Sequence, residues 1–295
     1  MTVCLQKKSL SSYLLGSLML FIFGFAYAAD LPIESTVPGG IAIIKLDQTS
    51  NMAPSVTYNN KPVMVIKHEG SWHALVGIPL RAKAGKHSIT SKLGGNNKAY
   101  NFSVNDKAYE TQHITIKDKR KVTPNEEDLK RIRAEKKKIN AALAHWDDTF
   151  YAESVQLDLP AQGQLSSPFG LRRFFNKQPR NPHSGIDIAA SKGTPITAPA
   201  NGKVILTGDF FFNGNSVFLD HGQGLITMYC HMDTIAVEVG DMINRGEEIG
   251  TIGMTGRVTG PHLHWSVSMN DARIDPNLIV PALQQNEAPQ TTPNM

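Results

Sequence analysis

The sequence predicts two β-rich domains joined by one amphipathic helix. Short strand-like runs separated by turn residues occupy residues 29–120, a pattern of helical period follows in 121–150, and strand-like runs return in 151–281. Period two is typical of strands and period 3.6 of helices. A chain of 295 residues with 41% hydrophobic residues is long enough to bury two cores.

The first segment, residues 1–28, has the pattern of a secretory signal peptide. Lys7 and Lys8 precede the apolar run "YLLGSLMLFIFGF", and small residues follow in "AYAAD". We expect cleavage after Ala28, and hence export to the periplasm, the cell envelope or the medium. An uncleaved membrane anchor is the alternative interpretation. No later stretch is apolar enough to span a bilayer, so no stable membrane insertion is expected after cleavage.

Charge and cysteine content limit the possible functions. Loss of the two lysines of the signal lowers the formal charge from +4 to +2, which is too small to indicate a nucleic-acid partner. Of the two cysteines, Cys4 lies in the signal and Cys230 remains alone. An intramolecular disulfide is therefore excluded, and the fold must be held by its core or by a metal.

Residues 29–120 contain several short β-rich runs, such as "GIAIIKL", "KPVMVIKH" and "KHSITSKL", with turns such as "YNN" and "HEG" between them. This spacing predicts a small antiparallel sandwich. No constellation of chemically active residues stands out in this domain.

The segment 121–150 predicts a helix that links the two domains. We expect Thr123 as its N-cap, Pro124 at its first position and Glu126 as the second member of a capping box. Apolar residues then recur at helical spacing, at Leu129, Ile132, Ile139, Leu143 and Trp146.

Residues 151–281 are strand-like and rich in glycine, which predicts a compact all-β domain. The tail 282–295 is polar and contains proline, and we expect it to be disordered.

The strand-like run "HLHWSV" carries two histidines on one face. Side chains two apart on a strand point the same way, so His262, His264 and Ser266 share a polar face opposite an apolar one. A His-x-His pair by itself is weak support for a metal site, and partners must be sought elsewhere in the domain.

Two further segments supply such partners. In "NPHSGIDIAA", His183 and Asp187 are suitable zinc ligands, and a turn at Ser184 and Gly185 would bring both inward; an ordinary polar loop before a strand is the alternative.

In "LITMYCHMDT", period two places Thr227, Tyr229 and His231 on one face. The same alternation points Cys230 away from His231 and into the core, which argues against a nucleophilic thiol.

Together, "FGLRR", "HSGIDIAASKGTPITAPANGKV", "YCHM" and "IGMTGRVTGPHLHW" resemble the lysostaphin-type (LytM-like) zinc metallopeptidases that cut peptidoglycan cross-links. The resemblance covers about residues 157–279. It implies a barrel-like β-sandwich of the duplicated-hybrid-motif type, related to lipoyl-type carrier domains. The preceding region resembles, more loosely, the N-terminal part of some envelope members.

The resemblance also implies a role for each residue. His183, Asp187 and His264 would bind one Zn²⁺ and leave a position open for water, as in catalytic zinc sites. His231 and His262 would face the water and the substrate carbonyl, and their roles as base and oxyanion donor stay interchangeable. Peptidoglycan is the implied partner. The alternative is a non-catalytic module of the same fold that binds cell wall or activates another hydrolase.

Two further residues are candidates for substrate binding. Arg172 or Arg173 in "FGLRR" is expected to contact a substrate carboxylate, and Arg172 is the chosen candidate. Tyr229 shares the predicted site face and could help to hold an oxyanion. The alternatives are a surface charge for the arginine and packing at the sheet edge for the tyrosine.

Overall fold

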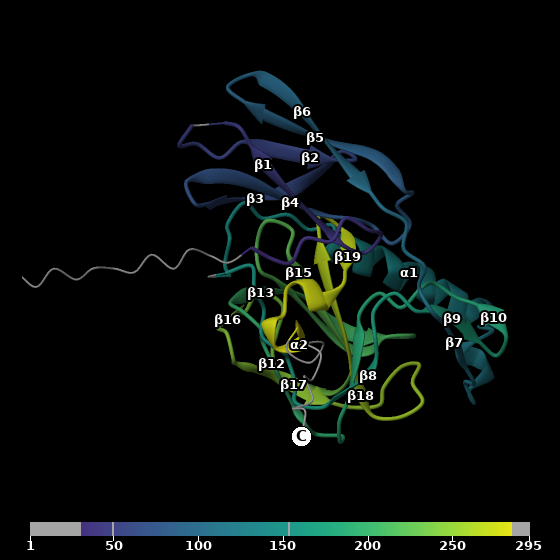
Figure 1. The fold of residues 1–295 in the computed structure, drawn as a ribbon. Coiled ribbons are helices and arrows are strands. Elements are labelled where there is room, and N and C mark those ends of the chain that lie inside the picture. The colour runs from purple at the N-terminus through teal and green to yellow at the C-terminus, as the bar shows by residue number, and fades with distance from the viewer. Residues whose placement is uncertain (1–30, 49, 153, 285–295) are drawn as a thin grey trace, which may run out of the picture.

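A computed structural model describes residues 31–48, 50–152 and 154–284, which form two β-rich parts with a helix at their side (Figure 1). The predicted signal, residues 1–28, lies outside the described residues. Within the described ranges, no helix is long and apolar enough to cross a membrane.

The N-terminal part is one six-stranded antiparallel sheet with the order β1-β4-β3-β2-β5-β6. Apolar residues from both halves of the sheet form one core, which includes Leu46, Val63 and Ile89. The sheet therefore folds over on itself, as expected for a small sandwich. Its strands are β1 (Ile41–Leu46), β2 (Ser55–Tyr58), β3 (Lys61–His68), β4 (Ser71–Gly77), β5 (Gly85–Leu93) and β6 (Asn96–Val104).

The next strand, β7 (Thr111–Ile114), leaves this sandwich although it lies within the range 29–120 expected for it. It pairs in parallel with β9 (Arg172–Phe175), which is also paired with β10 (Gln178–Pro179). Asn176 fixes this pairing, because its side chain accepts from the backbone N–H of Ile116 and donates to the Ile116 carbonyl. Period two predicts a strand here, but it does not specify the partner strand.

Helix α1 (Glu126–Leu143) follows a short 3-10 turn, η1 (Lys119–Lys121), and begins two residues later than the sequence pattern indicated. Its N-cap is Asn125 rather than Thr123, and Asp128 completes the capping box in place of Glu126. Asp128 is preferred because it also receives two hydrogen bonds from the Arg120 guanidinium, which fixes the start of the helix.

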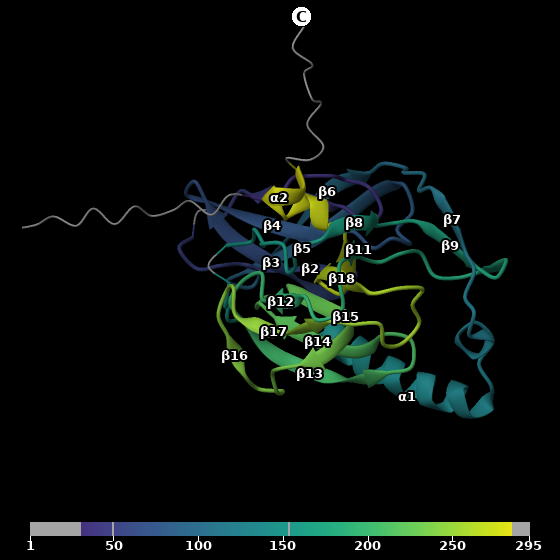
Figure 2. The same ribbon diagram turned by 90° about the horizontal axis from the view of Figure 1, so that it is seen from below.

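The C-terminal part is a ten-stranded antiparallel sheet whose main path runs β16-β13-β14-β15-β18-β11-β8. This arrangement confirms the predicted barrel-like all-β fold (Figures 1 and 2). The strands are β8 (Gln164–Ser167), β11 (Ile186–Ala189), β12 (Pro195–Thr197), β13 (Gly202–Phe210), β14 (Gly214–Asp220), β15 (Ile226–Ile235), β16 (Met242–Ile243), β17 (Glu248–Ile252), β18 (His262–Met269) and β19 (Ala272–Ile274).

After β19 the chain forms a 3-10 turn, η2 (Pro276–Leu278), and a short helix, α2 (Pro281–Gln284). Residues 282–284 thus belong to a helix, whereas the sequence predicted a disordered tail from 282 onward. The reason is that Leu283 is buried against the main core. The rest of that tail, residues 285–295, lies outside the described residues.

Besides the core of the N-terminal sheet, one buried hydrophobic cluster spans both β-rich parts. Ile41, Met64 and Leu75 of the N-terminal sheet belong to the same buried cluster as Trp265 and Met269 of β18. Figure 1 shows the N-terminal sheet lying directly over β19. Because apolar surface is continuous across this junction, the two parts are held together by burial as well as by hydrogen bonds.

The other face of the C-terminal sheet is covered by α1. Leu143 of the helix packs with Phe218, Met228 and Cys230, which lie on β14 and β15. Figure 2 shows α1 running beneath β13 and β14. The helix therefore covers the part of this sheet face formed by β14 and the first half of β15, and no helix among the described residues covers the part that carries the histidines.

Candidate metal centre and active site

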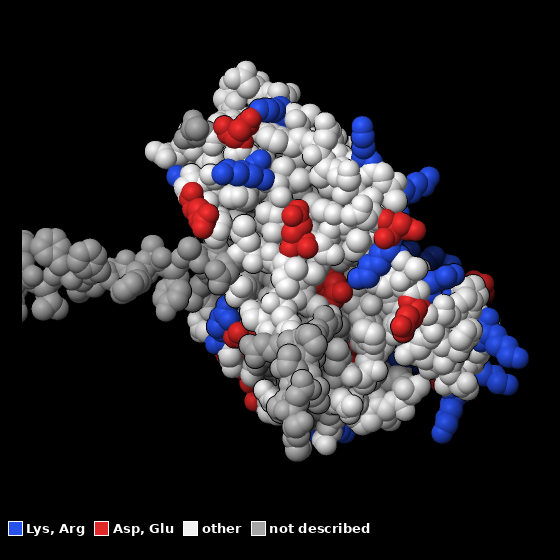
Figure 3. All heavy atoms as spheres, viewed as in Figure 1, with Lys and Arg blue, Asp and Glu red and all other residues white. Residues whose placement is uncertain are grey.

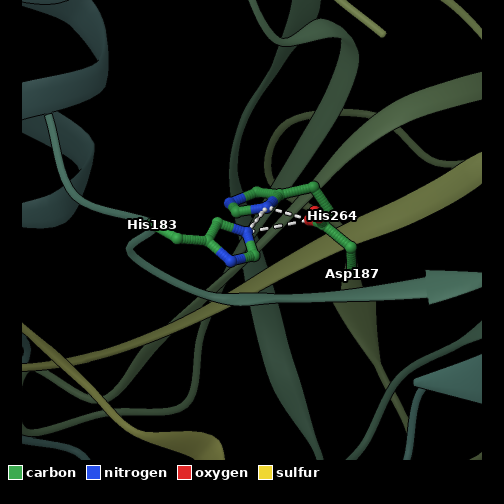
Figure 4. Close-up of side chains that lie close together, drawn as sticks. All are labelled: His183, Asp187 and His264. Carbon is green, nitrogen blue, oxygen red and sulfur yellow. Dashed lines mark hydrogen bonds and ion pairs between the residues drawn. The ribbon is translucent and has the colours of Figure 1, made fainter. Parts of the chain in front are cut away.

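Three predicted metal ligands meet between β11 and β18. Asp187 and His264 are directly opposite in the antiparallel register, and His183 reaches them from the turn before β11. His183 Nε2 lies 2.9 Å from Asp187 Oδ1 and 3.0 Å from His264 Nδ1, and His264 Nδ1 lies 2.7 Å from Asp187 Oδ1 (Figure 4). The three ligand atoms converge on one point.

Gly185 makes this convergence possible. A Cβ atom at this position would lie 2.2 Å from the Trp265 carbonyl oxygen and 2.7 Å from Ser266 Oγ. Only glycine lets the turn approach β18 so closely. The turn expected at this glycine from the sequence therefore has a steric basis in the structure.

The hydrogen bonds around His183 indicate that the three ligands require a cation between them. His183 Nδ1 lies 2.7 Å from the Pro168 carbonyl oxygen, which can only accept, so Nδ1 carries a hydrogen. In the neutral ring, Nε2 then presents a lone pair toward the Asp187 carboxylate and His264 Nδ1. A cation between these atoms removes the repulsion, and two imidazole nitrogens with one carboxylate form a donor set that suits Zn²⁺. The residues present therefore fit a metal.

Burial sets the protonation of the ligands. Burial opposes the charged form of Asp187, but the interactions with the imidazoles of His183 and His264 outweigh it and hold the pKa of the carboxyl well below its usual value. Burial also lowers the pKa of His264 to about 4, against the opposing effect of Asp187. At neutral pH the site thus offers a carboxylate and a neutral His264 imidazole, the forms that bind metal.

Arg173 fixes the Asp187 carboxylate and was not recognised as a positioning residue from the sequence. Its Nη2 donates to Asp187 Oδ2 at 2.7 Å and to Ser167 Oγ at 3.0 Å. Its Nε donates to Gln112 Oε1 at 3.1 Å, so β7 contributes to holding the site. Consecutive side chains on a strand point to opposite faces, so Arg172 and Arg173 of β9 point in opposite directions. No sequence pattern indicates which of the two arginines turns inward.

Arg172, the candidate chosen from the sequence, is exposed at the start of β9. Its backbone N–H donates to the Glu110 carbonyl, and no described contact joins its side chain to the metal ligands. A contact between Arg172 and substrate stays a prediction.

His231 and His262 lie beside the three ligands. Their ring centroids are 4.8 Å apart, and the His231 ring is 6.2 Å from that of His264. His231 Nδ1 donates to the Thr255 carbonyl at 2.8 Å, and His262 Nδ1 donates to the Gly260 carbonyl at 2.9 Å. In its neutral form, each ring therefore presents an unprotonated Nε2. Burial, reinforced by neighbouring His262 and His264, lowers the pKa of His231 well below its usual value.

The position of Tyr229 corrects the predicted strand face. Thr227 and Tyr229 do share a face, but that face is the core: Tyr229 is fully buried against its cross-strand neighbour Trp265, and its hydroxyl contacts Thr227 Oγ1 at 2.9 Å. His231 leaves this alternation because its φ is +65°, which rotates its side chain toward His262. Tyr229 has no access to a substrate in this structure.

Cys230 is buried with Phe218 and Met228 beneath α1, in the core as expected. Burial raises the pKa of its thiol to about 12, so the sulfur stays protonated at neutral pH. A protonated and buried thiol is a poor nucleophile.

Positive charge borders the site. The Arg257 guanidinium lies 4.6 Å from the Phe175 ring centre and 4.3 Å from that of Phe212. Burial, then the positive charges of Arg180 and Arg173, lower the pKa of Arg257 to about 10, and it remains charged at neutral pH. Figure 3 shows lysines and arginines gathered over the part of the surface formed by α1, β9 and β10.

Comparison with known proteins places this geometry in a family. Residues 181–276 match the profile of Peptidase family M23, and residues 34–107 match that of the Peptidase family M23 N-terminal domain. A solved structure from Pseudomonas aeruginosa, assigned to peptidase M23, is 43% identical; the alignment covers 84% of this chain and 96% of that one, with a TM-score of 0.72. This chain belongs to peptidase family M23.

Curated relatives match less than half of this chain. Peptidoglycan DD-endopeptidase ShyA of Vibrio cholerae is 37% identical over 140 residues, which cover 44% of this chain and 32% of ShyA. DD-carboxypeptidase/endopeptidase Mpg of Neisseria meningitidis is 39% identical over 113 residues, which cover 38% of this chain and 26% of Mpg. The chain thus spans about a third or less of the length of these relatives.

Proposed function

We propose that this M23 protein is an exported zinc endopeptidase that hydrolyses peptide bonds in the cross-links or stem peptides of bacterial peptidoglycan. The observation that carries the proposal is the convergence of His183, Asp187 and His264 within 3.0 Å of one another, with two further imidazoles alongside. The name of ShyA, a peptidoglycan DD-endopeptidase, supports peptidoglycan as the substrate, and the name of Mpg supports endopeptidase activity. The signal-like residues 1–28 support action in the periplasm or the cell envelope.

In this proposal His183 Nε2, Asp187 Oδ1 and His264 Nδ1 hold one Zn²⁺. When bound, zinc supplies Lewis acidity, which polarises a peptide carbonyl and makes a water molecule more acidic. The chain contributes the orientation of each ligand: Pro168 holds the ring of His183, Arg173 holds the carboxylate, and Ser266 Oγ lies 3.1 Å from His264 Nε2. Such outer contacts fix ring orientation and increase metal affinity.

His231 and His262 move protons in the proposed reaction. Each has its Nδ1 hydrogen held by a backbone carbonyl, so Nε2 is the atom that accepts a proton from water and passes it to the leaving amine, or, once protonated, donates to the developing oxyanion. The two rings lie next to each other, so the structure supports either division of these roles.

Digestion of purified peptidoglycan tests the proposal and separates it from a non-catalytic wall-binding module. We expect the wild-type protein to release fragments whose masses, by mass spectrometry, identify the bond that is cut. The variant His264→Ala should lose both metal and activity. The variants His231→Ala and His262→Ala should keep about one zinc per chain at this site and lose activity.

A matched control is His113→Gln, which removes an exposed imidazole on β7 that stacks on Phe174 and contacts none of the five site residues. It should retain both metal and turnover. Full activity in all three site variants would exclude the proposed chemistry, whereas binding to peptidoglycan without any turnover by the wild type would favour the non-catalytic module.

A further inference from the structure

A second group of potential metal ligands lies away from the first, where the chain leaves α1 and passes over the turn between β14 and β15. His145, Asp147 and Asp220 each offer one ligand atom, and these atoms all lie within 4.8 Å of one another. The three residues come from two segments of the chain. Asp220 ends β14, whereas His145 and Asp147 follow α1.

Asp220 is the residue that requires an explanation. It is 0% exposed, and its Oδ1 accepts a hydrogen bond from the backbone N–H of Gly222. Its Oδ2 is buried and accepts no hydrogen bond from the residues that the structure describes. Burial raises the pKa of the Asp220 carboxyl, and the nearby Asp147 acts in the same direction. A buried carboxylate oxygen without a donor is costly unless a cation compensates it.

The other two groups are arranged around this oxygen. His145 Nε2 lies 3.3 Å from Asp220 Oδ2, in an orientation that does not make a hydrogen bond. Asp147 is held in place because Thr149 N–H donates to its Oδ1 and the Tyr151 hydroxyl donates to its Oδ2. Each Asp147 oxygen retains a further lone pair for a ligand bond.

We propose that His145, Asp147 and Asp220 bind a divalent transition-metal ion, with Zn²⁺ as the best match to one imidazole nitrogen and two carboxylate oxygens. Water completes the coordination on the side of His145, whose side chain is 45% exposed. The ion joins the end of α1 to the β14–β15 turn and so holds the helix on the sheet. With the site between β11 and β18, the chain then binds two metal ions rather than one.

An ion pair between protonated His145 and Asp220 is the competing explanation. It compensates one of the two carboxylates and leaves the group with a net negative charge, and it leaves Oδ2 without a hydrogen bond in the observed orientation. A divalent cation compensates both carboxylates and contacts Oδ2 directly. The two explanations differ in one measurable quantity, the uptake of metal.

The test uses the full chain with the first site disabled by His183→Ala together with His264→Ala. Dialysis against Zn²⁺, followed by metal analysis and calorimetric titration, should give one bound zinc per chain. Adding Asp220→Asn should reduce this to none. Adding His145→Gln, at an exposed position that does not endanger folding, should weaken binding by more than the about tenfold loss typical of an outer contact.

The matched control is Asp148→Asn, which removes an exposed carboxylate of the same loop that bonds to Trp146 Nε1. It should leave zinc uptake unchanged. Zinc should also slow amide hydrogen exchange in residues 143–151, and it should do so only when Asp220 and His145 are present. The proposal is overturned if the double variant, shown to be folded by circular dichroism, binds no zinc, or if His145→Gln and Asp220→Asn leave uptake unchanged.

Discussion

Arg173 donates a hydrogen bond of 2.7 Å to Asp187, on the carboxylate oxygen opposite the one that faces His183 and His264. Because the same guanidinium is also bonded to Gln112 of β7, a segment from outside the barrel takes part in orienting a metal ligand. Arg173 is a positioning residue, since it touches the ligand and not the metal position. Its neighbour Arg172 provides a natural comparison, because it is exposed.

Replacing Arg173 by alanine should weaken zinc binding at the first site by about 10- to 100-fold, the usual effect of losing an outer contact. Arg173→Lys should restore the charge but not the paired donors, and should recover only part of the affinity. Metal competition titrations measure both effects.

Arg172→Ala is the control and should leave zinc affinity unchanged, while any role in substrate binding should raise KM. Equal zinc affinities for Arg173→Ala and Arg172→Ala would contradict the positioning role.

The left-handed backbone conformation at His231 should affect the stability of variants at this position. With φ at +65°, any residue with a Cβ is strained by about 1–2 kcal/mol relative to glycine. His231→Gly should therefore be more stable than His231→Ala by about 1 kcal/mol in chemical denaturation, although both lose the imidazole.

His262 provides the opposite comparison, because it lies in β18 with an ordinary negative φ. There the alanine variant should be more stable than the glycine variant by about 0.5–1 kcal/mol. The same order of stability at both positions would show that His231 is not strained.

Asn270 should contribute to holding the N-terminal sheet on the barrel. Its side chain accepts from Gly77 N–H at 2.7 Å and donates to the Gly77 carbonyl at 3.0 Å, and both contacts are buried. Asn270→Gly accepts the same left-handed backbone but removes both bonds, so unfolding free energy should fall by about 2 kcal/mol. Hydrogen exchange at Gly77 should become faster.

Asn60→Gly is the matched control, because Asn60 also has a positive φ of 62° but is exposed in a turn. This substitution should leave the unfolding free energy unchanged or raise it slightly. If Asn60→Gly lowered the unfolding free energy as much as Asn270→Gly, the contacts of Asn270 with Gly77 would not be the cause of the destabilisation.

The contribution of the start of α1 to stability should depend on pH. The Arg120 guanidinium beside Asp128 holds the pKa of that carboxyl below its ordinary value of 3.8. A lowered pKa in the folded state means that the contribution to stability is present above pH 3.8 and is lost as the pH falls through the folded-state pKa. Asp128→Asn should be less stable than the wild type at pH 7, and the difference should shrink below pH 3.8.

Urea denaturation at several pH values measures this difference. Glu127→Gln is the control, since its exposed carboxylate lies in the same first turn and acts on Arg120 through its charge alone, without a described hydrogen bond. A pH-independent difference between wild type and Asp128→Asn would contradict the ion-pair explanation.

The sequence by itself predicted the β-rich parts and the linking helix, and its resemblance to a known family pointed to five candidate site residues, which the structure brings close together. The spacing of His262 and His264 was sufficient to predict that they share a face, because side chains alternate along a regular strand wherever that strand lies in the fold. The glycine between His183 and Asp187 likewise predicts a turn, and its close approach to Trp265 gives that turn a steric basis. In each case the deciding information is local, within a few residues of the chain.

The tertiary structure decided what depends on contacts between distant segments. Period two placed Tyr229 with His231, but the left-handed backbone at His231 separates them, and Tyr229 turns into the core. The choice of Arg173 over Arg172 depends on Asp187 and on a parallel strand that comes from outside the barrel. Side-chain direction at an irregular position, and the partner of a buried charge, are set by packing between segments, and local periodicity carries no information about either.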